Sequence, residues 1–230
     1  KDHLVQLKQK YEVKIASDNV KAVKESDVVL LAVKPQQMND VLLEIAPSIT
    51  KKVLISIAAG VDTAHIFDKL GKRVDLVRVM PNSPALVGKG ISVLSPAEGC
   101  AQDSLELVSR LFSSIGEVIF LREKFQNEAT ALSGSGPAYF YLFVEALIEA
   151  GLKIGLSHEI AKKLVLETLA GSITMLKETD ESPEILKEAV TSRGGTTEAA
   201  LKVFTEAKFK ETVYQAIEAA VKRAGELDKA

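Results

Sequence analysis

The sequence predicts an α/β segment built on a mostly parallel sheet, followed by an all-α segment. Three observations support this division. Stretches typical of strands and helices alternate as far as residue 120, helical patterns dominate from residue 138, and two glycines and a proline within residues 134–137 separate them. Strands that alternate with helices in this way form a twisted sheet with right-handed crossovers. We therefore expect two domains, residues 1–122 and 123–230.

Five apolar stretches in the first segment are the main strand candidates: residues 27–33, 52–57, 76–80, 91–94 and 117–120. Residues 11–16 also alternate like a short strand. The continuous apolar run 27–33 suits a strand that is covered on both faces. Helical patterns lie between the strands, at residues 20–25, 37–45, 63–70 and 104–113.

Ligands of such sheets bind beyond the carboxyl ends of the strands. The turns 32–35, 57–60 and 80–84 are therefore candidates for a binding role, because their small residues let a ligand approach the backbone closely. Each turn taken alone is also an ordinary strand end.

The second segment contains five helix candidates: residues 138–151, 158–176, 183–190, 198–204 and 209–227. Pro137 suits the first turn of one helix, and Ser157 and Ser182 suit the N-cap positions of two others. Residues 191–197 form a glycine-containing loop that delivers two threonines at a helix start. Free backbone N–H groups and the helix dipole there favour an anion such as a small carboxylate, whereas a plain threonine cap with a glycine turn is the alternative.

Composition and charge exclude several classes of protein. Of the 230 residues, 47% are hydrophobic and the formal net charge is −2, so we expect a packed core and no nucleic-acid partner. The apolar runs are too short to span a bilayer. A single cysteine, Cys100, cannot form an internal disulfide and fits a reducing cytoplasm. The three histidines lie far apart without clustered acidic or thiol companions, so we expect no metal site.

Four motifs occur along the chain: Ala-Val-Lys-Pro at residues 32–35, Asn-Ser-Pro at 82–84, Leu-Ser-Gly-Ser-Gly-Pro-Ala at 132–138 and Thr-Ser-Arg-Gly-Gly-Thr-Thr at 191–197. In their order and spacing, the chain resembles the pyrroline-5-carboxylate reductase family over essentially its whole length. The resemblance implies a Rossmann-like dinucleotide-binding domain followed by a helical domain for substrate binding and dimerisation. It also implies a homodimer, and larger rings of dimers occur in the family.

The family's reaction transfers hydride from NADPH or NADH to the C=N carbon of 1-pyrroline-5-carboxylate, which yields L-proline in the last step of proline biosynthesis. The cofactor carries this hard step, so the protein mainly has to position two molecules and stabilise charge. The resemblance implies that Asn19 contacts the adenosine ribose and that Asn82 lies near the nicotinamide. The other residues that it implies for the cofactor cleft are Ala32, Val33, Lys34, Pro35, Ala58 and Ala59.

The resemblance also implies roles in substrate binding. Backbone N–H groups of Gly195 and Thr196, with the hydroxyl of Ser192, hold the substrate carboxylate in this interpretation. The hydroxyl of Thr197 is the candidate catalytic group, because it can hydrogen bond the ring nitrogen as that atom becomes an amine. Glu123 matches a glutamate close to the substrate in the family, although a lone surface glutamate is the simpler interpretation.

Two features depart from the family. Its substrate loop usually reads Ser-Pro-Gly-Gly, whereas Arg193 occupies the proline position here. A Gly-x-Gly-x-x-Gly motif after a first strand normally receives the pyrophosphate, and no such motif occurs near the start of this sequence. We expect the first strand, the glycine loop and the following helix to lie upstream of Lys1.

Two other interpretations are open at this point. A β-hydroxyacid dehydrogenase-like oxidoreductase would need a catalytic lysine on the helix between the domains, and residues 132–151 contain no lysine. A non-catalytic dimerisation or ligand-binding module would show no oxidation of NADPH in the presence of pyrroline-5-carboxylate.

Overall fold

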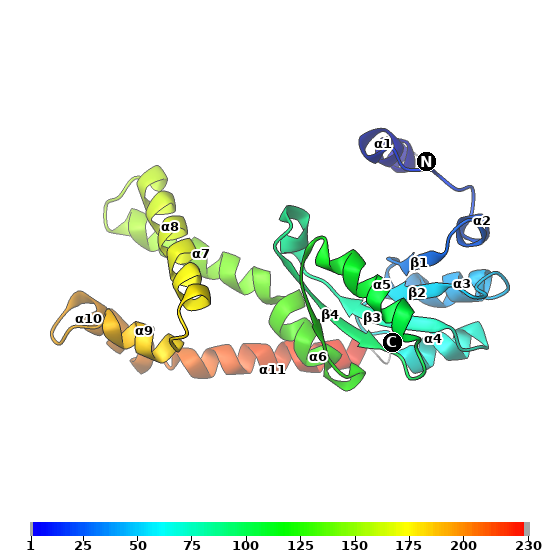
Figure 1. Cartoon of the computed structure of the whole chain (residues 1–230). Coiled ribbons are helices and arrows are strands. Elements are labelled where there is room, and N and C mark those ends of the chain that lie inside the picture. Colours follow the sequence, from blue (N-terminus) through cyan, green and yellow to red (C-terminus); the bar gives the residue numbers. More distant parts are fainter. Residues whose placement is uncertain (1, 228–230) are drawn as a thin grey trace. The chain divides into compact units, whose positions relative to one another are not determined.

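A computed structural model describes residues 2–227 of the chain, which form two compact units (Figure 1). One unit contains the residues up to Gly134 together with those from Ala220 onward, and the other is Ser135–Ala219. The first unit is an α/β domain and the second is helical, as the sequence predicts. The compact units divide after Gly134, so the domain boundary expected after residue 122 stays a prediction.

The first unit alternates strands and helices. Its elements are α1 (Asp2–Tyr11), α2 (Asn19–Lys24), β1 (Val28–Leu31), α3 (Pro35–Ile45), β2 (Val53–Ser56), α4 (Thr63–Leu70), β3 (Asp75–Met80), the 3₁₀ helix η1 (Ser83–Val87), β4 (Gly90–Pro96), α5 (Gln102–Ser113), β5 (Gly116–Phe120), the 3₁₀ helix η2 (Glu123–Phe125), α6 (Gln126–Ala129) and the π-helix η3 (Thr130–Gly134). The five strands predicted between residues 27 and 120 are confirmed.

The strands form one five-stranded sheet in the order β1-β2-β3-β4-β5. The pairs β1–β2, β2–β3 and β4–β5 are parallel, and β3–β4 is antiparallel. The antiparallel pair has a simple cause. Only nine residues separate Met80 from Gly90, whereas a parallel crossover needs about a dozen or more.

Two apolar clusters cover the two faces of the sheet. Leu54 and Leu76 are register partners that face the cluster containing α2, α3 and α4, whereas Ile55 and Val77 face the cluster containing α5. Alternation along each strand thus supplies two opposite apolar faces, and the result is a layered helix–sheet–helix core.

The strand predicted at residues 11–16 is wrong. Helix α1 includes Tyr11, and residues 12–16 have no regular structure. A strand satisfies its backbone groups by pairing with a neighbouring strand, and residues 12–16 pair with no strand of the described sheet.

The second unit is built from α7 (Gly136–Lys153), α8 (His158–Glu178), α9 (Pro183–Ala189) and α10 (Thr196–Glu206), and α11 (Phe209–Leu227) begins in it. Ser157 and Ser182 cap their helices as predicted, because their hydroxyls accept hydrogen bonds from the N–H groups of Ile160 and Ile185. Helices α7 and α8 approach closely: a Cβ atom placed on Gly151 would lie 2.8 Å from the Cβ of Ala161. Within residues 2–227, every helix is too short or too polar to span a bilayer.

Replacing Leu42 by alanine tests the first core cluster. Leu42 is 0% exposed on α3, whereas its neighbour Leu43 is 59% exposed. We expect Leu42→Ala to lower the free energy of unfolding by about 2–5 kcal/mol, because it removes buried methyl groups and leaves a cavity. Leu43→Ala, the matched control, should change it by less than about 0.5 kcal/mol. Denaturant unfolding measures both, and equal effects of the two substitutions would contradict this packing.

Candidate functional site

The carboxyl ends of three parallel strands meet at one edge of the sheet. Leu31 at the end of β1 is the register partner of Ser56 at the end of β2, and Ser56 is the register partner of Arg78 in β3. The turns that follow these strands therefore lie at the same edge. This arrangement brings together seven of the eight residues predicted for the cofactor: Ala32, Val33, Lys34, Pro35, Ala58, Ala59 and Asn82.

This edge suits a dinucleotide in shape and charge. Ala32 is exposed and Ala59 half-buried, and neither side chain extends beyond a methyl group. Lys34 is exposed and is the N-cap residue of α3, where no side chain caps the helix. The positive end of the helix dipole and the lysine charge favour a negatively charged group there. Ala58 is buried, so it can present only its backbone.

Asn19 is the exception among the predicted cofactor residues. It is the first residue of α2, and its side-chain amide donates a 2.7 Å hydrogen bond to Glu44. Glu44 lies in the last turn of α3, about 14 Å along the helix axis from Pro35 at the strand edge. The ribose contact of Asn19 stays a prediction, and in this structure the side chain joins two helices instead.

Asn82 connects two segments at the edge. Its Oδ1 accepts a hydrogen bond from the N–H of Ile91 at 2.9 Å, and its Nδ2 donates to the carbonyl of Ser133 at 3.2 Å. The amide therefore links the turn after β3 to β4 and to the π-helix η3. This structural role is what the described contacts support, and the proximity of Asn82 to a nicotinamide stays a prediction.

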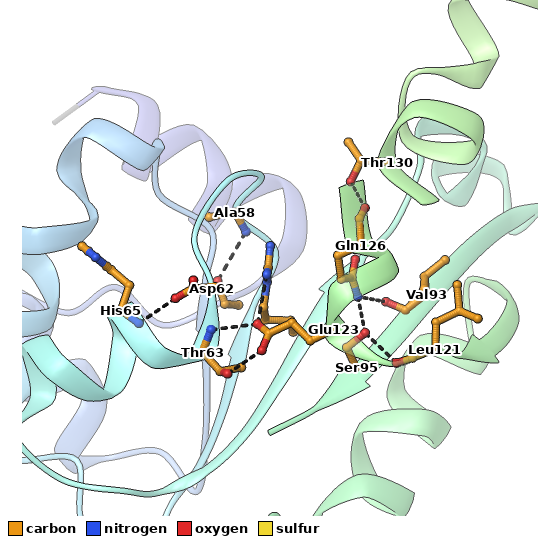
Figure 2. Close-up of polar contacts among 12 residues, drawn as sticks. Ala58, Asp62, Thr63, His65, Val93, Ser95, Leu121, Glu123, Gln126 and Thr130 are labelled. Carbon is orange, nitrogen blue, oxygen red and sulfur yellow. Dashed lines mark hydrogen bonds and ion pairs between the residues drawn. The ribbon is translucent and has the colours of Figure 1, made fainter. Parts of the chain in front are cut away.

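A buried glutamine, Gln126, hydrogen bonds the segment that leads into η3 to strand β4 (Figure 2). Gln126 is 2% exposed, and its Nε2 donates to Ser95 Oγ at 2.7 Å and to the carbonyl of Val93 at 3.3 Å. The hydroxyl of Ser95 donates in turn to the carbonyl of Leu121 at 2.8 Å. All of the polar groups in this chain of hydrogen bonds have partners, so the segment is tied to β4 at a defined position.

Glu123 is the centre of a second network (Figure 2). Its Oε1 accepts from Arg78 Nη1 at 2.9 Å and from the N–H of Thr63 at 2.8 Å, and its Oε2 accepts from Thr63 Oγ1 at 2.6 Å. The Arg78 side chain is 6% exposed and the Glu123 side chain 28% exposed. A buried guanidinium stays charged and needs a carboxylate partner, which Glu123 supplies. The structure therefore favours a structural role for Glu123, and its contact with substrate stays a prediction.

The loop at residues 191–197 belongs to the helical unit. Gly195 is the N-cap of α10, and no side chain caps that helix. The alternative of a plain threonine cap is therefore wrong. The Gly195 N–H donates to the carbonyl of Ser192 at 3.0 Å, which closes a turn. A Cβ atom on Gly195 would lie 2.4 Å from Ser192 Oγ, so a larger residue would require the Ser192 side chain to move.

This geometry bears on one part of the predicted substrate site. The Gly195 N–H donates to the carbonyl of Ser192 within the turn, and its predicted contact with the substrate carboxylate stays a prediction. Thr196 and Thr197 stand in the uncapped first turn of α10, where backbone N–H groups lack partners within the helix. Ser192 is exposed and Thr197 half-buried. The roles predicted for Ser192, Thr196 and Thr197 stay predictions.

Three features of the sites escaped the sequence analysis. Arg78 had a visible signal, because a charged residue inside the apolar run 76–80 needs a partner. Glu198 stands at the third position of α10, where an acidic residue often bonds back to the preceding backbone, and its carboxylate accepts from the N–H of Gly194 at 2.7 Å. Gln126 had no comparable signal.

The Cys100 thiol and the arrangement of potential metal-ligating side chains are two further features of the described part of the chain. Burial, and then the charge of Asp75, raises the pKa of the Cys100 thiol, which keeps it protonated and weakly nucleophilic at neutral pH. Within residues 2–227, no group of three or more His, Cys, Asp or Glu side chains is arranged to hold a metal ion.

Two family models match the chain. Residues 1–60 match the model described as NADP oxidoreductase, coenzyme F420-dependent, and residues 123–227 match the model described as pyrroline-5-carboxylate reductase dimerisation. Together with the strand edge, they define an oxidoreductase that uses a nicotinamide dinucleotide and combines a Rossmann-like domain with a helical dimerisation domain.

Individual relatives narrow this class to one family. A pyrroline-5-carboxylate reductase from Synechocystis is 39% identical over 97% of this chain and 83% of its own length. Solved pyrroline-5-carboxylate reductases include that of Coxiella burnetii, with 41% identity, a TM-score of 0.90 and coverage of 100% of this chain and 86% of that one. The Plasmodium falciparum structure, which has NADP bound, shows 38% identity and a TM-score of 0.89 over 93% of this chain and 81% of that one. The chain belongs to the pyrroline-5-carboxylate reductase family.

Replacing Glu123 by alanine tests its role beside Arg78. We expect the free energy of unfolding to fall by on the order of 3 kcal/mol, because the buried guanidinium loses its charged partner. Glu117→Ala on β5 is the control, since Glu117 is exposed and has no ion pair among the described residues. Thermal and denaturant unfolding measure both variants. Unchanged stability with a raised KM for pyrroline-5-carboxylate would instead support direct contact with the substrate.

Proposed function

We infer that the protein reduces 1-pyrroline-5-carboxylate to L-proline, with NADPH or NADH as the hydride donor. The observation that carries this conclusion is the similarity of 93–100% of the chain, at 38–41% identity, to two reductases of known structure. Neither rival interpretation is favoured. The relatives are reductases rather than non-catalytic modules, and they are not named as β-hydroxyacid dehydrogenases.

The reaction requires a hydride at the ring carbon of the C=N bond and a proton at the ring nitrogen. The dinucleotide, when bound, supplies the hydride, so NAD(P)H becomes NAD(P)⁺ and the imine becomes a secondary amine. The substrate carries a carboxylate that does not react. The chain's own residues therefore have to hold the dinucleotide, orient the carboxylate and stabilise the nitrogen as its protonation changes.

The edge formed by β1, β2 and β3 is the proposed cofactor site. The short side chains of Ala32 and Ala59 permit close approach to the backbone, and Val33 and Pro35 continue the same turn. Lys34 and the uncapped start of α3 suit a phosphate group of the dinucleotide. Asn82 holds the turn after β3 in place through its two hydrogen bonds.

The loop before α10 is the proposed substrate site. We propose that the N–H of Thr196 and the hydroxyl of Ser192 hold the substrate carboxylate. Thr196 begins the uncapped helix α10, where the dipole favours an anion, and the Ser192 hydroxyl lies beside the N-cap residue Gly195. The hydroxyl of Thr197, in the same turn, hydrogen bonds the ring nitrogen in this proposal. The N–H of Gly195 contributes through the turn that it closes rather than as a direct donor.

A homodimer is the proposed assembly. The helical unit leaves many large apolar side chains exposed, among them Phe140, Tyr141, Leu142, Leu164 and Ile173. In the described part of that unit only Gly136, Gly151 and Ala161 are classed as buried, so its helices lack a core of their own. Exposed apolar surface of this extent marks a protein–protein interface.

We further propose a cytoplasmic location, which suits a chain with one unpaired cysteine. Rings of dimers stay an expectation from the family.

An assay of NAD(P)H oxidation tests both the function and the role of Thr197. The wild-type protein should oxidise NADPH or NADH only when pyrroline-5-carboxylate is present. Thr197→Ala should lower kcat by about 100-fold or more, because a positioned proton-transfer group contributes on that scale. Thr212→Ala on α11 removes a hydroxyl that, among the described residues, bonds only the carbonyl of Lys208, and it should leave kcat unchanged.

Two results of this assay would count against the proposal. No oxidation of either cofactor by the wild type would refute the reductase function. Equal kcat for wild type and Thr197→Ala would remove that hydroxyl from the mechanism while leaving the function intact.

A further inference from the structure

A carboxylate from α10 bonds back across the loop that precedes the helix. Glu198 Oε2 accepts the N–H of Gly194 at 2.7 Å. Gly194 has a φ angle of +73°, in the left-handed region that glycine tolerates best. The bond therefore fixes the most permissive backbone position of the loop in one conformation.

The other end of the loop is also anchored. The N–H of Thr191 donates to the carbonyl of Glu188 at 2.9 Å, and the Thr191 hydroxyl donates to the carbonyl of Lys187 at 2.6 Å. Between these anchors, the N–H of Gly195 closes its turn onto Ser192. Among the described residues, the bond to Glu198 is the only hydrogen bond or ion pair made by Gly194 or its neighbour Arg193 that holds this part of the loop.

The carboxylate of Glu198 could either compete with the substrate for its donors or hold the loop in position, and the donor that it bonds distinguishes these two roles. An internal carboxylate that competed with the substrate would occupy the proposed substrate donors, the N–H of Thr196 or the hydroxyl of Ser192. Glu198 instead bonds the N–H of Gly194 and leaves those two groups available. It also places its negative charge in the first turn of α10, where the helix dipole favours it.

We propose that Glu198 is a positioning residue that holds the substrate loop in its binding conformation, and that it supplies the stiffness which a proline at position 193 would otherwise give. Proline fixes its own φ angle and restricts the residue before it, here Ser192. The charge-assisted hydrogen bond from the N–H of Gly194 to Glu198 restrains the same turn, residues 192–195, from its C-terminal side. This inference rests on the proposed function, because it assigns the loop to substrate binding.

Steady-state kinetics of the full protein test the proposal. Glu198→Ala should raise KM for pyrroline-5-carboxylate by about fivefold to tenfold, the effect of one charge-assisted hydrogen bond at an exposed site, with KM for NADPH unchanged. Glu198→Gln keeps an acceptor oxygen and should recover most of the affinity. Adding Arg193→Pro to Glu198→Ala should lower KM again. Glu206→Ala, on the same helix and also exposed, removes the same charge together with a 3.9 Å surface ion pair to Lys202, and it should leave KM unchanged.

Each other outcome has a distinct meaning. A wild-type protein that does not reduce pyrroline-5-carboxylate refutes the proposed function itself. If the wild type is active and Glu198→Ala has an unchanged or lower KM, Glu198 does not position the loop. A similar rise in Glu206→Ala would make the effect one of general charge and overturn the proposal. If Arg193→Pro gives no recovery, the proposed equivalence with proline is wrong. Thermal unfolding of each variant shows whether a changed KM reflects a changed fold.

Discussion

The in-register parallel pairing of β1, β2 and β3 is the constraint on which the rest of the first unit depends. The two strands β1 and β2 have only four residues each, and their pairing fixes where three separate turns emerge. A slip of one residue would exchange Leu54 with Ile55 between the two apolar clusters, and the close packing of side chains within each cluster opposes that exchange. The binding edge is thus a consequence of core packing rather than of the turns themselves.

Polar groups inside the unit then determine how the chain leaves the sheet. Arg78 stands within the buried strand β3, and its charge requires the carboxylate of Glu123. The same carboxylate receives both donors of Thr63, so one residue connects β3, the start of α4 and the segment after β5. Removing one partner of such a buried ion pair lowers the free energy of unfolding by far more than the intact pair adds to it. The network therefore fixes the positions of these segments more than it adds net stability.

Much of the fold was predictable because its signals are local. Apolar runs gave the five strands, and the serines at positions 157 and 182 gave two helix starts that the structure confirms. The strand expected at residues 11–16 failed because alternation alone cannot supply a neighbouring strand. The antiparallel pair β3–β4 follows from the nine-residue connection between Met80 and Gly90, which is too short for a parallel crossover.

The site was predictable in part, for a different reason. The resemblance located the strand-end turns and the loop before α10, and the structure gathers the turns at one edge. The hydrogen-bond partners were not predictable, since Glu123 meets Thr63 and Arg78 across separations of 60 and 45 residues. Asn82 and Gly195 show the same limit: both stand where the motif placed them, but their polar groups are engaged within the protein.

Transfer of deuterium from the cofactor tests the central claim most directly. The protein is incubated with 1-pyrroline-5-carboxylate and NADPH that carries deuterium at C4 of the nicotinamide, on each face in turn, and the product is analysed by mass spectrometry and NMR. We expect L-proline with one deuterium on Cδ, the ring carbon that is bonded to nitrogen and does not carry the carboxylate, from one of the two labelled cofactors only. Unlabelled proline from both cofactors, or deuterium on any other carbon, would contradict direct hydride transfer to the imine.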